Sequence, residues 1–475
     1  MMMASFAAFL IGFLLIGLVS VLKSRGTKSD YYLASRSVPP ALAGLSAVAT
    51  NNSGYMFIGV IGFTYATGLA AIWLMVGWIV GDFLASLFIH RQLRLSTERT
   101  REVTFAGVLS RWQGGDFSYL RKTAALATVL FLGAYAAAQL AAGGKALQAL
   151  FDWQRETGAI IVALMVALYC LAGGIRASIW TDAAQALVMV VAMGLLFIVA
   201  VADLGGINAA WQQLANVPHY LEWFPSDLAV PGVSGMALFV TGWLFAGFSV
   251  IGQPHIMVRF MALDRADHIR QARFYYYGFF AVFYALATGV GLLSRLYLPD
   301  LHNLDPELAL PRIARMLLPP VFVGMILAGI FAATMSTADS LVLACSSALT
   351  HDLLPRRLEK TWEIKTATMA VTLLALAIAL ADTQSVFSLV ILAWSTLASA
   401  FGPLLLVLAL GRPVEEWLAL AMMAVGTATA WTWRHFGLHA DIYEGMPGML
   451  AGLGVYAALC RVRGASFKTS RLADR

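Results

Sequence analysis

The chain has 475 residues, of which 60% are hydrophobic and only 12% are charged, with a mean hydropathy of +0.76 and a formal net charge of +6. Soluble globular proteins are nearer to about 45–50% apolar and about 25% charged, so this composition excludes an ordinary soluble domain and indicates a polytopic integral membrane protein. The positive charge does not indicate nucleic-acid binding, because the basic residues lie in loops between apolar runs.

Apolar runs long enough to cross a bilayer follow one another along the chain. A spanning helix needs about 20 apolar residues. The first run, 4–22, has no basic segment before it and is followed by Lys23 and Arg25, which predicts a spanning helix and not a cleaved signal peptide. We therefore predict a single all-α domain, 1–475, with about thirteen transmembrane helices. The predicted spans are 4–22, 39–68, 70–90, 123–148, 157–175, 179–203, 234–258, 274–299, 319–346, 366–381, 386–410, 415–433 and 447–461.

Basic residues lie mainly on one side of these spans. If residue 1 lies outside the cell, most of the 32 Lys and Arg residues fall in inner loops and in the C-terminal tail, whereas the long outer loop 204–233 contains none. Cytoplasmic loops carry an excess of Lys and Arg. We therefore predict a multi-pass membrane protein with its N-terminus outside, its C-terminus in the cytoplasm and its basic loops near anionic lipid headgroups.

Two spans contain residues that interrupt a helix. The polar residues 50–53 lie in the middle of span 39–68, and Pro254 follows Gly242, Gly247 and Gly252 in span 234–258. Irregular backbone at membrane depth lines protected cavities, and paired breaks indicate a transporter site. The two spans lie five apart and cross in opposite directions, as the first helices of two inverted repeats would. The alternative is that the glycines serve only close helix packing.

A run of hydroxyl side chains in span 319–346 suggests a cation site. Ser336, Thr337 and Ser340 occupy positions i, i+1 and i+4, so their oxygens share one helical face. Hard cations such as Na⁺ take several oxygen ligands, and carbonyls freed by the break at 50–53 could complete the shell. The alternative is that these hydroxyls bond carbonyls of their own helix.

Three acidic residues, Asp82, Asp182 and Asp339, lie within or at the ends of spans. Ionisable residues in the membrane suggest function, and the second and third lie at similar depth, where they could share a second cation or a proton. The alternative is that Asp182 caps a helix N-terminus and Asp339 bonds a neighbouring helix. We interpret Asp82 as a hydrogen-bonding link between helices.

Four segments resemble those of a known family. They are 252–262 (GQPHIMVRFMA), 332–340 continued by Cys345-Ser346-Ser347, 178–182 (SIWTD) and 30–36 (DYYLASR). The likeness runs in one order from about residue 5 to about residue 460. On these motifs the chain resembles the sodium:solute symporter family, and most nearly its bacterial sodium/proline symporters.

The resemblance implies a LeuT-type fold built from two inverted repeats of five helices. The first repeat would span 39–203 and the inverted second repeat 234–410. One extra helix, 4–22, would precede this core, and two extra helices would follow it within 415–461.

The resemblance also implies ion sites. The implied sodium ligands are the carbonyls of Ala49, Asn52 and Ala333 and the hydroxyls of Ser336 and Thr337. Some relatives hold a second sodium near the positions of Asp182, Ser336, Asp339 and Ser340, but here an aspartate, Asp339, stands where those relatives carry serine.

The substrate residues implied by the resemblance cluster at the two breaks and on one further helix. They are Asn51, Ser53, Gly54, Tyr55, Tyr135, Trp243 and Pro254. Asn51 stands where proline symporters typically carry aspartate, and Tyr55 stands where they carry tryptophan. A helix N-terminus and hydroxyls can hold a carboxylate, and aromatic rings can face an amine, so the set suits a small zwitterion.

We therefore expect a symporter that is not an enzyme, carrying Na⁺ and a small organic solute, with proline or a related amino acid as the expected solute. Other solutes (pantothenate, a monocarboxylate, a sialic acid), a proton in place of Na⁺, and a membrane sensor or receptor are the alternatives. We expect no organic cofactor, no nucleic acid and no obligate protein partner; the expected partners are the solute, Na⁺ and the lipid bilayer.

Overall fold

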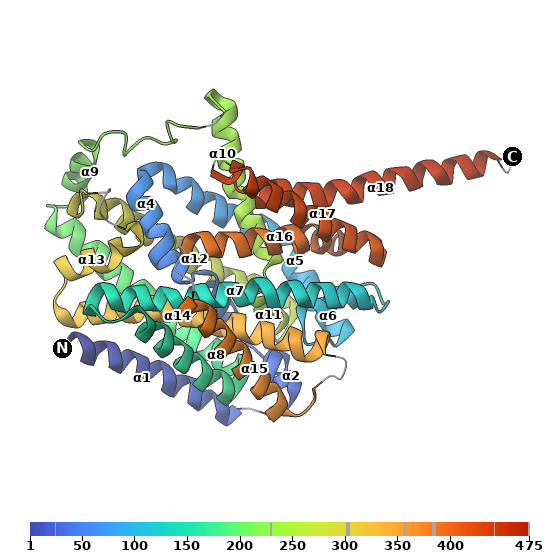
Figure 1. The fold of residues 1–475 in the computed structure, drawn as a ribbon, viewed down its shortest axis with the longest axis horizontal. Coiled ribbons are helices and arrows are strands. Elements are labelled where there is room, and N and C mark those ends of the chain that lie inside the picture. Colours follow the sequence, from blue (N-terminus) through green and yellow to red (C-terminus); the bar gives the residue numbers. More distant parts are fainter. Residues whose placement is uncertain are drawn as a thin grey trace.

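The computed structural model describes the chain apart from residues 24, 229, 301–304, 355–357, 382–385, 441 and 474–475. Within the described part every regular element is a helix, apart from one isolated bridge between Val38 and Leu263. The predicted all-α architecture is therefore confirmed. Two long helices, α7 (Ser118–Phe151) and α14 (Pro320–Ser347), cross the middle of the bundle side by side (Figure 1).

The other long helices also coincide with predicted spans. They are α1 (Met2–Ser20), α5 (Ile72–Thr100), α8 (Arg155–Asp203), α12 (Ile269–Tyr297), α15 (Thr361–Ala381), α16 (Val386–Ala409), α17 (Glu416–His435) and α18 (Gly445–Ala473). Short helices occupy predicted loops: α2 (Lys28–Leu33), α6 (Phe105–Arg111), α9 (Ile207–Ala215) and α13 (Ala309–Leu317). Over the described residues, nine helices are long and apolar enough to cross a membrane. The count of thirteen stays a prediction.

Helix α8 covers two predicted spans, 157–175 and 179–203, without an intervening loop. A sharp kink at Gly174 separates its two parts, with φ 57° and ψ −141°. That backbone conformation is open mainly to glycine, and a Cβ at this position would lie 2.5 Å from the carbonyl oxygen of Tyr31. One glycine therefore replaces the loop expected between the two spans.

The first predicted break is present. Helix α3 (Pro40–Asn51) ends at Asn52, whose φ of −83° and ψ of 59° leave the helical region. After Ser53 and Gly54 the chain continues as a π-helix, η3 (Tyr55–Val60), and then as α4 (Ile61–Thr67). The polar residues 50–53 thus mark the end of one half-helix.

The second break is also present. Helix α10 (Gly232–Phe248) tightens into a 3₁₀ turn, η5 (Ser249–Gly252), and α11 (Pro254–Met261) begins at the proline. Proline suits the first turn of a helix because its missing N–H is not needed there. Gly252 allows α16 to approach, since a Cβ would lie 2.7 Å from Ala398 Cα. Helix α16 packs against both η5 and η3, so it touches both breaks.

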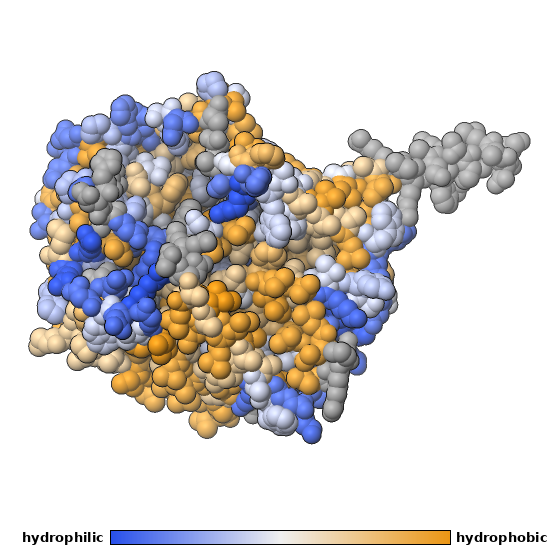
Figure 2. Space-filling model, in the orientation of Figure 1, coloured by the Kyte–Doolittle hydropathy of each residue, from blue (hydrophilic) through white to orange (hydrophobic). Residues whose placement is uncertain are grey.

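The outer surface has the distribution of a membrane protein. Large apolar side chains are exposed on the outermost helices, among them Ile11 and Leu15 of α1 and Leu164 and Leu187 of α8. Figure 2 shows apolar residues gathered over α1 and α8, between two more hydrophilic ends. In contrast, nearly every side chain of α14 is buried, which makes this hydroxyl-bearing helix part of the core.

Candidate functional site

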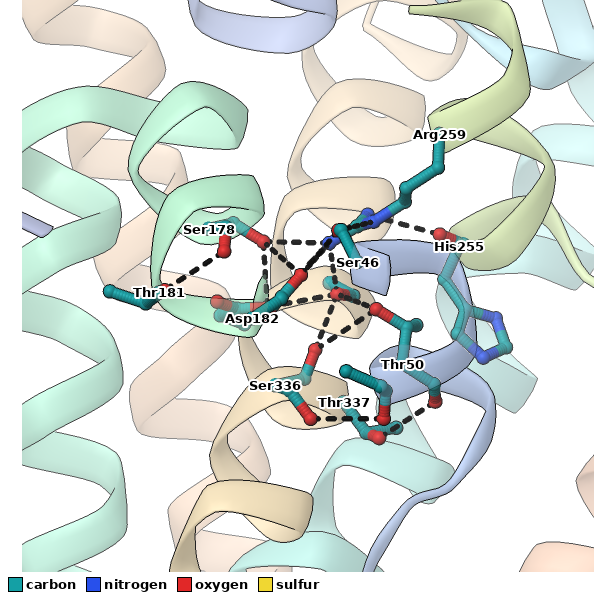
Figure 3. A network of polar contacts seen from close by, with 12 residues as sticks. Ser46, Thr50, Ser178, Thr181, Asp182, His255, Arg259, Ser336 and Thr337 are labelled. Atoms are coloured by element: carbon teal, nitrogen blue, oxygen red, sulfur yellow. Dashed lines mark hydrogen bonds and ion pairs between the residues drawn. The ribbon is translucent and has the colours of Figure 1, made fainter. Parts of the chain in front are cut away.

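Backbone carbonyls at the broken end of α3 face the hydroxyls of α14 (Figure 3). Ser336 Oγ lies 3.1 Å from the carbonyl oxygens of both Ala49 and Ala333. Thr337 donates its hydroxyl to the carbonyl of Thr50 at 2.8 Å. The last four carbonyls of a helix have no partner within it, so the oxygens at this end of α3 can accept a cation.

The structure thus brings together three of the five predicted sodium ligands: Ala49 O, Ala333 O and Ser336 Oγ. Thr337 lies beside them and bonds the next carbonyl of α3. Asn52 follows directly as the C-terminal cap of α3, and its N–H donates to Val48 O. The oxygens are neutral carbonyls and hydroxyls, which is ligand chemistry suited to a hard monovalent cation.

Four of the predicted substrate residues meet next to this oxygen cluster. Tyr135 of α7 donates its hydroxyl to Ser53 Oγ at 3.1 Å, and the N–H of Tyr55 donates to the same oxygen at 3.1 Å. The N–H of Gly54 donates to Gln139 Oε1 at 2.8 Å. Sequence reasoning missed Gln139, although it follows Tyr135 by four residues and so shares its helical face.

Aromatic rings enclose this polar group. The ring centroid of Tyr55 lies 5.7 Å from that of Trp78, which lies 5.1 Å from Trp394 of α16. Tyr135 lies 5.6 Å from His255 and 6.4 Å from Trp394. Sequence reasoning missed these two tryptophans and the histidine. Tryptophan is enriched at membrane interfaces, so a tryptophan in the middle of a span is unusual. The tryptophans in the middle of spans 70–90 and 386–410 could therefore have indicated a site.

Trp243 lies apart from that group. It is on α10, with its ring 5.9 Å from Phe63, and it lines a cavity of about 670 Å³ together with residues of 217–228 and Tyr443. Ser53 and Tyr135 are not among the residues that line this cavity. The structure therefore places Trp243 in the cavity wall, and Pro254 at the first position of α11.

Asn51 is held in a buried chain of hydrogen bonds. Its Nδ2 donates to the hydroxyl of Tyr276 at 2.6 Å, and that hydroxyl donates to Asp82 Oδ2 at 2.7 Å. The chain joins α3, α12 and α5, and Asp82 thus links two helices as expected. Asn51 is oriented by Tyr276, so its amide has a structural partner in addition to any solute.

Several buried polar atoms around the breaks have no hydrogen-bond partner among the described residues. They include both side-chain atoms of Asn52, Gln253 Oε1, Gln139 Nε2 and both ring nitrogens of His255. Buried polar groups are nearly always hydrogen-bonded in native proteins. The six atoms named here are therefore available to bond a polar molecule between the two breaks.

The predicted second ion site contains a residue that sequence reasoning missed. Asp182, Asp339 and Ser340 lie together, but the guanidinium of Arg259 lies among them. Figure 3 shows Arg259 beside Asp182 and Ser178. Asp182 lies within α8 and not at a helix N-terminus, so the capping interpretation was wrong. Arg259 belongs to the segment 252–262, and a basic residue within an apolar stretch was the feature that could have indicated its role.

Ion pairs gather at the end of the bundle formed by α6 and the first turn of α7. Glu102 pairs with Arg111 at 2.9 Å, Arg121 at 3.0 Å and His351 at 2.8 Å, and Arg121 lies 3.5 Å from Asp352. Burial alone would raise the pKa of Glu102, but the hydrogen bond from His351 and the charge of Arg121 hold this pKa at about 2. The cluster ties together segments far apart in sequence, which gives His351 and Asp352 a structural role.

Comparisons with known proteins give relatives in sequence and in fold. A model of the sodium:solute symporter family matches residues 31–426. The chain is 31% identical to the high-affinity proline transporter PutP of Bacillus subtilis, over 93% of each chain. It is 30% identical to a sodium/proline symporter of Salmonella typhimurium, over 96% of this chain and 92% of that one. A solved structure of a Na⁺-coupled sialic acid symporter, substrate-bound and outward-open, is similar over 96% of both chains, with a TM-score of 0.79 at 18% identity. That likeness shows a shared fold.

Proposed function

Because this chain belongs to the sodium:solute symporter family and has its LeuT-type inverted-repeat fold, we propose that it carries a small zwitterionic solute, proline or a related amino acid, into the cell with Na⁺. It is a multi-pass membrane transporter and not an enzyme. The observation that carries the proposal is the convergence of Ala49 O, Ala333 O and Ser336 Oγ beside the break that also bears Ser53 and Gly54.

Sodium binds between α3 and α14 in this proposal. Its ligands are the carbonyls of Ala49, Asn52 and Ala333 and the hydroxyls of Ser336 and Thr337. On binding, the Ser336 hydroxyl turns its lone pairs to the ion and releases the carbonyls that it bonds here. The site needs no carboxylate, so the ion brings its full positive charge, and each 100 mV of membrane potential contributes about 2.3 kcal/mol to inward movement.

The solute binds beside the ion, among Ser53, Gly54, Tyr55 and Tyr135. Hydroxyls and the N–H groups of the broken helix suit a carboxylate, and the aromatic rings suit a small apolar ring or an amine. The names of the relatives, which are proline transporters, support proline. Asn51 and Tyr55 depart from the residues expected of proline symporters, and a related amino acid would fit the same chemistry.

Transport follows by alternating access about the two breaks. The cavity lined by Trp243 lies among residues of the predicted outer loop 204–233, so solute and ion would enter there and leave on the side of the Glu102 cluster. This direction fits the predicted topology, with the N-terminus outside and the C-terminus in the cytoplasm of a bacterial cell. The two predicted repeats, 39–203 and 234–410, would each contribute one broken helix.

Uptake of labelled proline into proteoliposomes tests the proposal. We expect accumulation with an inward Na⁺ gradient and none with a matched K⁺ gradient. Failure to accumulate proline, followed by success with another solute in the same Na⁺ gradient, would replace the solute and keep the coupling. Equal uptake in the two gradients, for any solute that is transported, would contradict sodium coupling.

A further inference from the structure

A single arginine occupies the space between two buried acidic residues. Arg259 Nη2 lies 3.3 Å from Asp182 Oδ2 and 3.8 Å from Asp339 Oδ1, and all three side chains are fully buried. Asp182 belongs to α8, Asp339 to α14 and Arg259 to α11, the half-helix that begins at the second break. A charged group therefore joins three helices at the same depth.

Hydroxyl groups complete the surroundings of the guanidinium. Its Nη2 donates to Ser178 Oγ at 2.6 Å and also to Ser340 Oγ, its Nε donates to Ser46 Oγ at 3.3 Å, and its Nη1 donates to His255 O at 3.0 Å. The same hydroxyls serve the acids (Figure 3). Ser46 donates to Asp182 at 2.6 Å, and Ser178 donates to Asp339 at 3.0 Å.

Electrostatics favours a cation at this position. Two ionised carboxylates that share hydroxyl partners in a buried site repel one another, and an uncompensated buried charge costs several kcal/mol. The guanidinium lies where an ion held by Asp182, Asp339, Ser178 and Ser340 would lie. It is attached to the chain and always charged, so it cannot leave the site as a transported ion would.

The charges of Asp182, Asp339 and Arg259 can be summed together with that of the proposed sodium ion. When both carboxylates are ionised, as at alkaline pH, two carboxylates and one guanidinium leave a net charge of −1. The Ser340 hydroxyl lies next to the oxygen cluster, because its oxygen is 3.1 Å from Thr50 Oγ1 and the carbonyl of Thr50 accepts the Thr337 hydroxyl. One Na⁺ beside Ser336 would neutralise the remaining charge, whereas a second mobile cation would give the site an excess of +1.

We propose that the Arg259 guanidinium is a tethered cation that takes the place of a second coupling ion between Asp182 and Asp339, so that one Na⁺ moves in each cycle. This inference rests on the proposed sodium symport. It also gives Asp339, which stands where relatives with two ions carry serine, a function as the second counter-charge of the arginine.

Counting bound sodium on the purified full-length protein tests the inference without a solute. Binding of radioactive sodium is measured to saturation at alkaline pH, with K⁺ held constant. We expect one ion per chain in the wild type and in Arg259→Lys, which keeps the charge. We expect two in Arg259→Ala, and one again when Asp339→Asn is added. Arg176→Ala is the matched control, because it removes a different buried arginine, 2.5 Å from Asp30, and should leave one ion.

The outcomes separate this inference from the proposed function. Two ions on the wild type, or one ion on both the wild type and Arg259→Ala, would overturn the tethered cation and leave sodium symport intact. No sodium on the wild type but one on Arg259→Ala would support the tethered cation and remove the proposed coupling site. No sodium on any variant would overturn both. If Arg259→Ala does not fold, Arg259→Gln removes the charge while keeping hydrogen-bond donors, and the same counts apply.

Discussion

Removing the two hydroxyls of the oxygen cluster should abolish sodium stimulation without unfolding the protein. The change is Ser336→Ala combined with Thr337→Val. Bonds between a hydroxyl and a charged group are worth about 1.5–3 kcal/mol, and each 1.4 kcal/mol is about tenfold in affinity. Loss of the Ser336 oxygen alone should therefore raise the Na⁺ concentration for half-maximal uptake by about 10- to 100-fold. The two residues are neighbours, so their effects need not add, but the double variant should lie beyond 100-fold.

The cost in folding should be small by comparison. Ser336 loses its bonds to the carbonyls of Ala49 and Ala333, and Thr337→Val keeps the shape of the side chain while losing the bond to Thr50. A typical internal hydrogen bond contributes about 1 kcal/mol, so the melting temperature without Na⁺ should fall by only a few degrees.

Two measurements decide the matter. Uptake in proteoliposomes gives the Na⁺ concentration for half-maximal rate, and the thermal shift of purified protein with Na⁺ gives binding without transport. Thr372→Val is a matched control: Thr372 is buried and bonds a carbonyl one turn back on α15, away from the cluster. A double variant that keeps the wild-type sodium dependence in both assays would refute the site.

Three further predictions concern other parts of the molecule. Tyr135→Phe removes the hydroxyl that donates to Ser53 and should raise KM for the solute about tenfold, with sodium binding unchanged; an unchanged KM in uptake kinetics would remove the tyrosine from the solute site. The pKa of Glu102 is lowered to about 2 from 4.5, so the contribution of this carboxylate to stability is present above about pH 4.5 and is lost as pH falls toward 2. Glu102→Gln should therefore lower the melting temperature at pH 6 and remove this part of its pH dependence. Equal profiles of melting temperature against pH for both proteins would count against the ion-pair cluster. Gly252→Ala places a Cβ 2.7 Å from Ala398 Cα and should cost about 1–3 kcal/mol of stability, seen as a lower melting temperature; wild-type stability would show that α16 does not approach the break this closely.

Local signals in the sequence predicted both breaks and the hydroxyl face of α14, whereas the carbonyls of Ala49 and Ala333 were named only from the family resemblance. Four consecutive polar residues, and a proline that follows glycines, interrupt a helix through their own backbone and side-chain chemistry. This effect depends only on residues that are neighbours in the chain, so it can be predicted from the sequence. The hydroxyl face of α14 follows from helical spacing. The kink at Gly174 escaped prediction because a single positive φ needs no polar or charged neighbour, and the two expected helices merged into α8.

The residues that were missed depend on packing between distant segments. Trp394 lies against the proposed solute residue Tyr135 only because α16 packs against both breaks. Trp243, predicted as a substrate residue, lines the cavity of about 670 Å³, and its place there depends on the fold. Arg259 is separated from Asp182 by 77 positions and from Asp339 by 80, and no spacing rule brings the three together. The sequence showed that charges were buried, but their pairing required the fold.

The order of ligands along one break explains how ion and solute can be coupled. The proposed sodium ligands Ala49 and Asn52 directly precede the proposed solute residues Ser53 and Gly54, and all four lie at the end of α3 or in the turn after it. An ion that ties this turn to α14 restricts the backbone that presents Ser53 and Gly54 N–H to the solute. The solute then binds a turn that is already ordered, so its binding no longer carries the entropy cost of ordering that turn. By thermodynamic linkage the solute must then tighten sodium binding by the same factor. Two separate sites would need a path between them, whereas here a single turn of backbone belongs to both.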